Sequence, residues 1–278
     1  MIAFNGQYLD KASHGNMRIT AACLGGQWVI GGNWLMTATA QAIIAAFGAE
    51  EGIAVIRRTN DYLNRIATTD PQRAQQLAGF INEDPLLVTS LVETSKTRWL
   101  VGDGVAYINT GLIPNTDTIA VCEYKITSIN SGANGIFGCR NKYQQNEMMV
   151  WCYVNHIECG WGNNNTQPEM VRQNYQGAHI VSLGNGVFSY DGVQYNGSPR
   201  GTFTSTAMPC FIFAVNTGGA PDGQRALGQD VAKFSMNDHT LLPFTYQGEA
   251  GMLDIISGTF HPNANTEGAF TIAITDKQ

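Results

Sequence analysis

Side chains suited to carbohydrate recognition are concentrated between residues 140 and 167. A pyranose ring has an apolar face and a rim of hydroxyl groups, so an exposed aromatic ring and planar amide or guanidinium donors bind it well. The segment is rich in both kinds of side chain: Arg140, Asn141, Tyr143, Trp151, Tyr153, Asn155, Trp161, Asn163 and Asn164. It is therefore the first candidate for a binding site.

The two tryptophans of this segment are expected to differ in exposure. Trp151, Tyr153 and Asn155 are spaced by two and would share one face of a strand. We expect that face to point into a core at Trp151. Trp161 stands between two glycines and close to asparagines, which favours an exposed platform. The predicted ligand-binding residues are Trp161, Asn163, Asn164, Arg140 and Tyr143.

Hydrolysis of a glycosidic bond is the enzymatic alternative. Retaining hydrolysis needs two carboxylates about 5 Å apart, which on one strand means acids at positions i and i+2 or i+4. Residues 96–278 contain no Glu-x-Asp-x-Glu pattern, and isolated acids lack same-face partners at this spacing: Glu123, Glu147, Glu158 and Glu169. Acids on neighbouring strands could still meet, so hydrolysis stays an alternative. The sequence has no GxSxG motif for a nucleophilic serine, and we expect no enzymatic activity.

Metal and disulfide chemistry have little support. Calcium needs clustered oxygen ligands, and the candidate loops are residues 163–165 and 222–224. Asparagine-rich loops more often cap their own backbone, so we expect no cofactor, with structural calcium left open. The six cysteines form no CxxC pair, which favours buried free thiols in a reducing compartment over a disulfide framework.

The composition excludes several functional classes. A chain of 278 residues predicts one or two domains. The net charge of −6 argues against binding to nucleic acid or an anionic membrane surface. No apolar run reaches membrane-spanning length, and residues 1–6 do not resemble a signal peptide. We therefore expect a protein made in a cytoplasm, without membrane insertion.

Residues 1–36 are expected to form an extended anchoring arm. Asn5-Gly6 predicts a hairpin turn, and apolar runs follow at residues 17–23 and 28–30. The segment is too short to enclose a core, so it must pack on the rest of the chain or on another subunit. The predicted assembly residues are Phe4, Tyr8, Trp28 and Trp34.

Residues 37–95 carry the signals of a helical connector. Residues 37–47 are rich in Ala and Ile and are followed by Gly48, a plausible helix stop. Residues 53–66 have an amphipathic stripe. Asp70-Pro71 and Asp84-Pro85 each combine an N-cap with proline at the first helical position, which predicts helices over 71–81 and 85–92.

Residues 96–278 are expected to form an antiparallel β-sandwich. Short apolar runs alternate with turn signals rich in Gly, Asn and Asp every eight to twelve residues. Residues 107–118 read as a strand, a turn and the start of the next strand, and residues 118–127 alternate well, with a bulge expected near Glu123. The predicted fold class is therefore α+β multidomain, with an extended arm and short helices before a sandwich or jelly roll.

Five segments of the β-rich part resemble, in order, the concanavalin A-like, laminin-G-type jelly rolls of Bacteroidales bacteria and their phages. They are Tyr107–Gly111 with Pro114-Asn115, Ile136–Arg140, Phe211–Asn216, Phe234–Met236 with Leu241–Phe244, and Gly251–Asp254 with Gly258–Asn263. The chain departs from the family pattern at Phe234–Met236 and at residues 275–278. The resemblance covers about two-thirds of the chain and does not include residues 1–95.

The resemblance implies a binding or virion-surface module with a sheet that accepts glycan, and it does not imply catalysis. With the arm and the helices, it suggests a phage virion protein: a head-fibre, capsid-decoration or tail-associated subunit. Expected partners are other virion proteins, further copies of the chain, a trimer included, and host surface glycan. The expected location is the virion, after synthesis in the host bacterial cytoplasm. The alternative from another class is a bacterial surface glycan-binding protein.

Overall fold

The chain folds into two compact units, which are described separately. A computed structural model describes residues 3–4, 7–8, 11–14, 17–24, 27–31 and 34–277, without 129–131, 133, 143–144, 155, 167–176, 196–202, 205–206 and 223–227. Side chains are described from residue 34 onward, except at 37 and 164–166. Unit 1 comprises residues 1–98 and 275–278, and unit 2 comprises residues 99–274. The arm and the helical connector, predicted as separate parts, thus belong to one unit.

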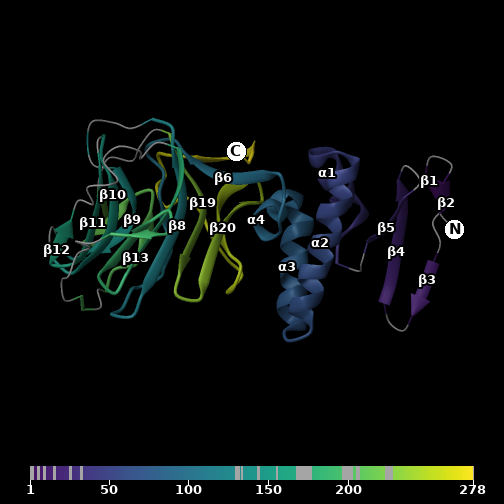
Figure 1. Cartoon of the computed structure of the whole chain (residues 1–278), viewed down its shortest axis with the longest axis horizontal. Helices are drawn as coiled ribbons and strands as arrows, with labels where there is room; N and C mark the ends of the chain where they lie inside the picture. The colour runs from purple at the N-terminus through teal and green to yellow at the C-terminus, as the bar shows by residue number, and fades with distance from the viewer. Residues whose placement is uncertain are drawn as a thin grey trace. The chain divides into compact units, whose positions relative to one another are not determined.

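Unit 1 begins with two small antiparallel sheets (Figure 1). Strand β1 (Ala3–Phe4) pairs with β2 (Gln7–Tyr8), and Phe4 lies opposite Gln7, the register of the predicted hairpin. The second sheet is a meander of β3 (Lys11–His14), β4 (Met17–Leu24) and β5 (Gln27–Gly31). The two apolar runs predicted from the sequence therefore correspond to β4 and β5.

The helices of unit 1 follow the local signals closely. They are α1 (Thr37–Phe47), α2 (Ala49–Ala67), α3 (Pro71–Glu83), the 3₁₀ helix η1 (Pro85–Leu87) and α4 (Val88–Leu91). Gly48 separates α1 from α2 with φ of 82°, and Asp70 Oδ1 accepts a hydrogen bond from Arg73 N at 2.9 Å, as an N-cap does.

The predicted N-cap role of Asp84 is wrong. Its side chain makes no capping hydrogen bond. Both carboxylate oxygens instead accept hydrogen bonds from the guanidinium of Arg98, one of them at 2.8 Å from Nη1. Arg98 is buried, and an unpaired buried charge costs more free energy than an uncapped helix end. The carboxylate of Asp84 therefore pairs with Arg98.

Unit 2 is an antiparallel sandwich of two sheets, as predicted. The eight-stranded sheet contains β7 (Ile108–Asn109), β9 (Asn134–Arg140), β10 (Glu147–Cys152), β11 (Ile157–Gly162), β12 (Asn164–Thr166), β16 (Phe211–Ile212), β17 (Val215–Thr217) and β18 (Ala220–Asp222). Its main path runs β12-β11-β10-β9-β16-β7, which places β10 inside the sheet.

The ten-stranded sheet forms the other layer (Figure 1). Its strands are β6 (Lys96–Gly102), β8 (Ile119–Ile126), β13 (Gly177–Gly184), β14 (Val187–Tyr190), β15 (Val193–Gln194), β19 (Gln229–Met236), β20 (His239–Tyr246), β21 (Glu249–Asp254), β22 (Thr259–His261) and β23 (Phe270–Asp276). One buried apolar cluster contains residues from both sheets, for example Phe137 of β9 and Phe234 of β19, whose ring centroids are 5.4 Å apart.

The bulge expected near Glu123 is present, and a second irregularity lies at Phe213. The pairing of β8 with β19 is irregular beside Glu123, but the extra residue lies in β19, between Val231 and Lys233. The segment Phe211–Asn216 contains parts of two strands, β16 and β17, because Phe213 between them has a positive φ of 67°. The chain reverses there, so β16 pairs antiparallel and β17 pairs parallel with β9.

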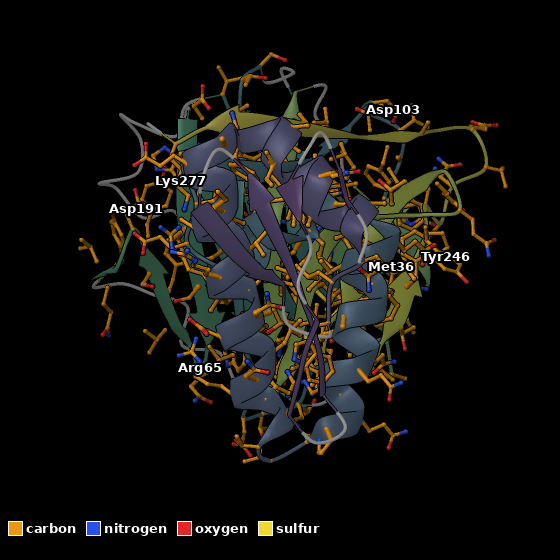
Figure 2. The ribbon with its side chains drawn as sticks, turned by 90° about the vertical axis from the view of Figure 1, so that its right-hand side faces the viewer. Met36, Arg65, Asp103, Asp191, Tyr246 and Lys277 are labelled. Carbon is orange, nitrogen blue, oxygen red and sulfur yellow. The ribbon has the colours of Figure 1, made fainter. Side chains whose placement is uncertain are left out.

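Side chains fix the loops that connect these strands. Asp103, labelled in Figure 2, accepts hydrogen bonds from the backbone N–H groups of Val105 and Ala106 at 2.8 Å and of Ala269 at 2.6 Å. An isolated bridge between Ile108 and Asn263 joins the same two stretches of chain. The early and late parts of unit 2 are thereby held together at this edge.

Candidate functional site

Strand β10 presents a different set of residues on each of its faces. Met148, Val150 and Cys152 belong to the apolar cluster between the sheets. Successive residues of a strand point to opposite sides, so Glu147, Met149 and Trp151 lie on the outer side. There Met149 and Trp151 form a separate buried cluster with Val215, and Tyr153 packs against it. We call this outer surface, with the neighbouring Arg140, Thr217 and Asp222, the β10 face.

Arg140, the last residue of β9, connects the polar groups of the β10 face. Its Nε donates to Thr217 Oγ1 at 2.9 Å, and its Nη2 donates to Asp222 Oδ2 at 2.6 Å. Its Nη1 lies 3.6 Å from Glu147 Oε2. The guanidinium also lies over the ring of Trp151, 5.5 Å from the centroid, a cation–π contact. Charge pairing and ring contact together hold the side chain in one position.

The aromatic part of the β10 face extends to the hairpin between β10 and β11. The rings of Tyr153 and His156 are stacked, with centroids 4.5 Å apart and planes 6° from parallel. Both rings are half-buried, and Val154 between them is exposed. Glu158, also half-buried, lies opposite Trp151 in the register of the two strands. Aromatic surface and hydrogen-bonding groups therefore lie together at this end of the face.

Glycine gives β10 its close fit to β9. Gly138 lies opposite Met149 and has φ of 148°. A Cβ at Gly138 would come within 2.5 Å of Met148 O and of Met149 Cα. Only glycine fits this approach, because the clash would be with backbone that cannot move aside.

The prediction that Trp161 forms an exposed platform is wrong. Its side chain is only 4% exposed and belongs to the cluster between the sheets, where its ring packs against Phe203 at a centroid distance of 4.8 Å. Trp161 lies opposite Met148 in the register of β10 and β11, and Met148 faces inward. The register therefore turns the ring of Trp161 into the core.

The prediction that Trp151 faces the sandwich core is also wrong. Trp151 is 3% exposed, but it belongs to the outer cluster of the eight-stranded sheet instead of the sandwich core. One sequence signal pointed this way: Glu147 shares the face of Met149 and Trp151, and a carboxylate seldom faces an apolar core. Sequence reasoning missed Thr217 and placed Asp222 only in a candidate calcium loop, whereas both residues reach the face from the hairpin of β17 and β18.

The other predicted ligand-binding residues have different environments. Arg140 is 6% exposed, and its donors are taken by the groups described above, so it is not an accessible ligand donor. Asn163 is exposed, and its Oδ1 accepts a hydrogen bond from Asn146 N at 2.8 Å. Asn164 lies in β12 opposite Trp161, and its side chain falls outside the description. Tyr143 lies outside the described residues.

The predicted assembly residues belong to unit 1. Phe4, Tyr8 and Trp28 lie in β1, β2 and β5, and their side chains fall outside the description. Trp34 is half-buried, and its Nε1 donates to Asn64 Oδ1 of α2 at 2.8 Å. This contact ties Trp34 to a helix of its own chain.

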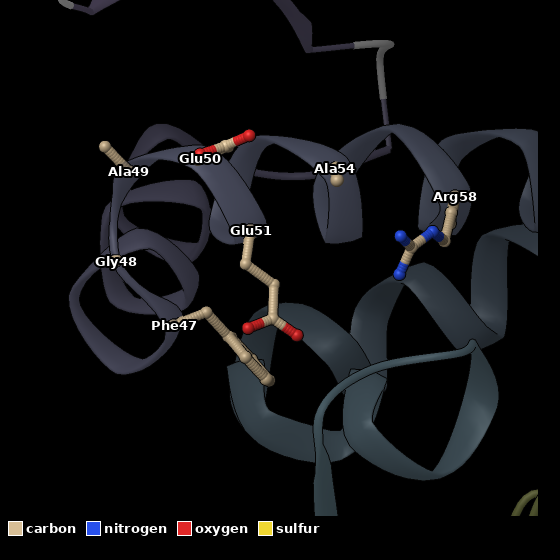
Figure 3. Close-up of a pocket in the computed structure, with 7 residues that line it drawn as sticks. All are labelled: Phe47, Gly48, Ala49, Glu50, Glu51, Ala54 and Arg58. Carbon is tan, nitrogen blue, oxygen red and sulfur yellow. The ribbon is translucent and has the colours of Figure 1, made fainter.

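A shallow hollow of about 570 Å³ lies at the junction of α1 and α2 (Figure 3). Phe47, Glu51 and Arg58 line it. Glu51 accepts hydrogen bonds from Ser95 N at 2.7 Å and Ser95 Oγ at 2.8 Å, and these bonds lower the pKa of Glu51. Arg58 donates to the backbone oxygen of Glu93. The charged groups of the hollow thus hold the 93–95 segment.

The His239–Asp254 pair lacks the geometry of a nucleophilic site. His239 Nδ1 lies 2.6 Å from Asp254 Oδ2, and Ser257 Oγ donates to the same oxygen at 2.6 Å. The imidazole and the hydroxyl therefore meet at the carboxylate instead of contacting each other, unlike a serine activated by histidine. His179 Nδ1 lies 2.8 Å from Asp191 Oδ2.

The described residues show neither a metal-ligand cluster nor a reactive thiol. Within the described parts of the chain, no three His, Cys, Asp or Glu residues form a metal-ligand group. Five cysteines are buried and free: Cys122, Cys139, Cys152, Cys159 and Cys210. Burial raises the pKa of Cys152 to about 12, so this thiol is a packing group at neutral pH.

Among the described helices, none is both long enough and apolar enough to cross a membrane.

Comparison with known proteins gave few matches. No protein-family model and no curated protein matches the chain. Among solved structures, a "putative carbohydrate binding protein" from Bacteroides ovatus is similar, with 12% identity and a TM-score of 0.46. The match covers 66% of this chain and 60% of the other, so this chain spans less than two thirds of that neighbour. So distant a likeness carries no argument about function, and the sandwich fold follows from the strand pairing described above.

Proposed function

We propose that unit 2 binds carbohydrate through the β10 face. One observation carries the proposal: the half-buried Tyr153 and the buried Trp151 share a surface with the hydroxyl of Thr217 and the carboxylate of Asp222. The half-buried ring of Tyr153, which packs against Trp151, offers aromatic carbon to the apolar side of a sugar, and the polar groups bond its hydroxyls. The Arg140 network holds these groups in place before a ligand arrives, which lowers the entropic cost of binding.

Substitution of Tyr153 tests this proposal. Tyr153→Ala removes a half-buried ring of the face, and we expect about a threefold to tenfold loss of affinity for any glycan bound by the full chain. The measurement is a glycan array followed by calorimetry. Tyr246→Ala is the matched control, because Tyr246 is an exposed aromatic on β20 of the other sheet (Figure 2). Equal losses for the two variants would contradict a site on the β10 face.

We further propose binding without catalysis. The described carboxylates closest to the centre of the face, Glu147 and Asp222, both pair with Arg140. This arrangement supports a fixed structural role for both acids, whereas a retaining glycosidase needs one acid to deliver a proton and the other to attack. Release of reducing sugar from a glycan that the protein binds, lost on Glu147→Gln, would contradict this proposal.

We also propose that the protein is a phage virion component that displays unit 2. The support is the sequence resemblance of the β-rich part and the separation of the chain into two compact units. Antibodies against residues 99–274 are expected to label purified phage particles in electron micrographs. Unlabelled particles, with the protein found at the bacterial surface instead, would favour the alternative of a bacterial glycan-binding protein.

A further inference from the structure

We infer that the β10 face selects uncharged sugars and disfavours anionic ones such as uronates and sialosides. This inference rests on the proposed carbohydrate site and adds the class of its ligand. It follows from the charges of the face and from which of them a ligand can reach.

The described charges at the centre of the face sum to −1. Arg140 contributes one positive charge, and Glu147 and Asp222 contribute two negative charges. A carboxylated sugar would therefore meet a net negative centre, although an arginine lies there.

The guanidinium of Arg140 is committed to the protein. Nε bonds Thr217 Oγ1, Nη2 bonds Asp222 Oδ2, and Nη1 lies beside Glu147. One side of the guanidinium plane lies over the ring of Trp151. A ligand carboxylate would have to displace these groups to form the paired contact that arginine usually offers to anions.

Two acids of the face, Asp222 and Glu158, are more accessible than its cation, whereas Glu147 is fully buried. The side chain of Asp222 is 43% exposed, whereas that of Arg140 is 8% exposed. Glu158 adds a half-buried carboxylate on β11 opposite Trp151. Two like charges about 4 Å apart repel by ~1 kcal/mol even at the dielectric constant of water, which corresponds to about a fivefold loss of affinity.

The test compares matched pairs of glycans, a neutral oligosaccharide and its sialylated or uronate counterpart, on the full chain by calorimetry. We expect the neutral member to bind at least about fivefold more tightly in low salt, and the difference to shrink as salt screens the charges. Equal affinities, or tighter binding of the anionic member, would overturn the inference and leave the carbohydrate site standing. No binding of either member would overturn the site and the inference together.

Charge-removing variants locate the cause. Asp222→Asn and Glu158→Gln are each expected to raise the ratio of anionic to neutral affinity by threefold or more. Lys142→Ala is the matched control: it removes an exposed charge next to the strand end and is expected to lower that ratio or leave it unchanged. A ratio unaltered in both acid variants, each shown to be folded by its circular dichroism spectrum, would contradict the electrostatic cause.

Discussion

At the scale of single residues, several side chains act through partners that lie in other secondary-structure elements. Arg140 contacts Glu147 and Asp222, and Asp84 contacts Arg98. In each case the carboxylates pair with a buried guanidinium. An arginine that is removed from water stays charged, so it needs carboxylates and hydrogen-bond acceptors nearby. Local sequence rules describe these carboxylates poorly for that reason.

The pair formed by Asp84 and Arg98 predicts a large effect within unit 1. Asp84→Ala removes this carboxylate from a guanidinium that is 2% exposed, and we expect a loss of about 3–5 kcal/mol in the free energy of unfolding. Asp276→Ala breaks the exposed pair with Lys96 and should cost less than about 1 kcal/mol. Urea unfolding of both variants measures the difference. Similar losses in the two variants would show that burial does not determine how much each ion pair contributes to the free energy of unfolding.

His261 predicts a pH dependence of stability. Burial lowers the pKa of His261, while its contact with Asn109 O and the nearby Asp254 raise it and His239 lowers it further. The unfolded chain therefore binds a proton more readily than the folded protein. The contribution of His261 to stability is complete above about pH 6.5 and is lost as the pH falls through the lower folded pKa.

Replacement of this histidine tests that sign. We expect His261→Phe to flatten the fall in melting temperature between pH 7 and pH 5, whatever its effect at pH 8, because phenylalanine does not titrate. Thermal unfolding of the two proteins across this range is the measurement. Parallel profiles for wild type and variant would exclude His261 as the titrating group.

At the scale of elements, close packing between strands limits which residues the sheets accept. Gly138 allows β9 and β10 to approach closely at Met149, a residue of the outer cluster. The helices impose no such limit on their exposed sides, since a Cβ at Gly79 of α3 would meet nothing within 4 Å. Identical substitutions in the two elements should therefore have opposite effects.

Two glycine substitutions make this contrast measurable. Gly138→Ala should destabilise the protein by at least about 2 kcal/mol, because its Cβ would clash with the backbone of β10. Gly79→Ala should stabilise it by up to about 1 kcal/mol, since alanine favours a helix and the site is open. Chemical unfolding followed by circular dichroism compares them. Gly138→Ala at wild-type stability would contradict the described register.

At the scale of the whole molecule, the sheets of both units have open edges, and those of unit 1 are small. Unit 2 joins its two sheets through one apolar cluster. Unit 1 contains a three-stranded sheet whose outer strands, β3 and β5, each pair only with β4 among the described strands. Open strand edges accept strands from other chains. Because β4 and β5 of this small sheet carry the apolar runs of residues 17–23 and 28–30, we propose that assembly occurs through unit 1.

Size measurement tests the assembly proposal. The full chain is expected to form an oligomer, such as a trimer. The fragment of residues 96–278 is expected to be monomeric. The fragment keeps β6 and β23, which pair with each other. Light scattering on both proteins at equal concentration gives the answer. A monomeric full chain, or an oligomeric fragment, would contradict assembly through unit 1.

Much of the fold could be predicted from local patterns. Asp70-Pro71 marked the start of α3, and Gly48 marked the end of α1, because caps and breakers act within a few residues. The alternation of residues 118–127 marked β8 for a similar reason. The reversal at Phe213 could not be predicted, since the tertiary structure overrides the conformational preference of that residue.

The sequence by itself determined the two classes of structure in this chain and the approximate positions of its helices. Only the tertiary structure decided which side of β10 faces the core and that Trp161, not Trp151, lies inside it. Alternation defines two faces of a strand but does not say which is buried when both are apolar. That choice comes from strand register and from distant residues such as Asp222, whose contacts depend on the folded chain.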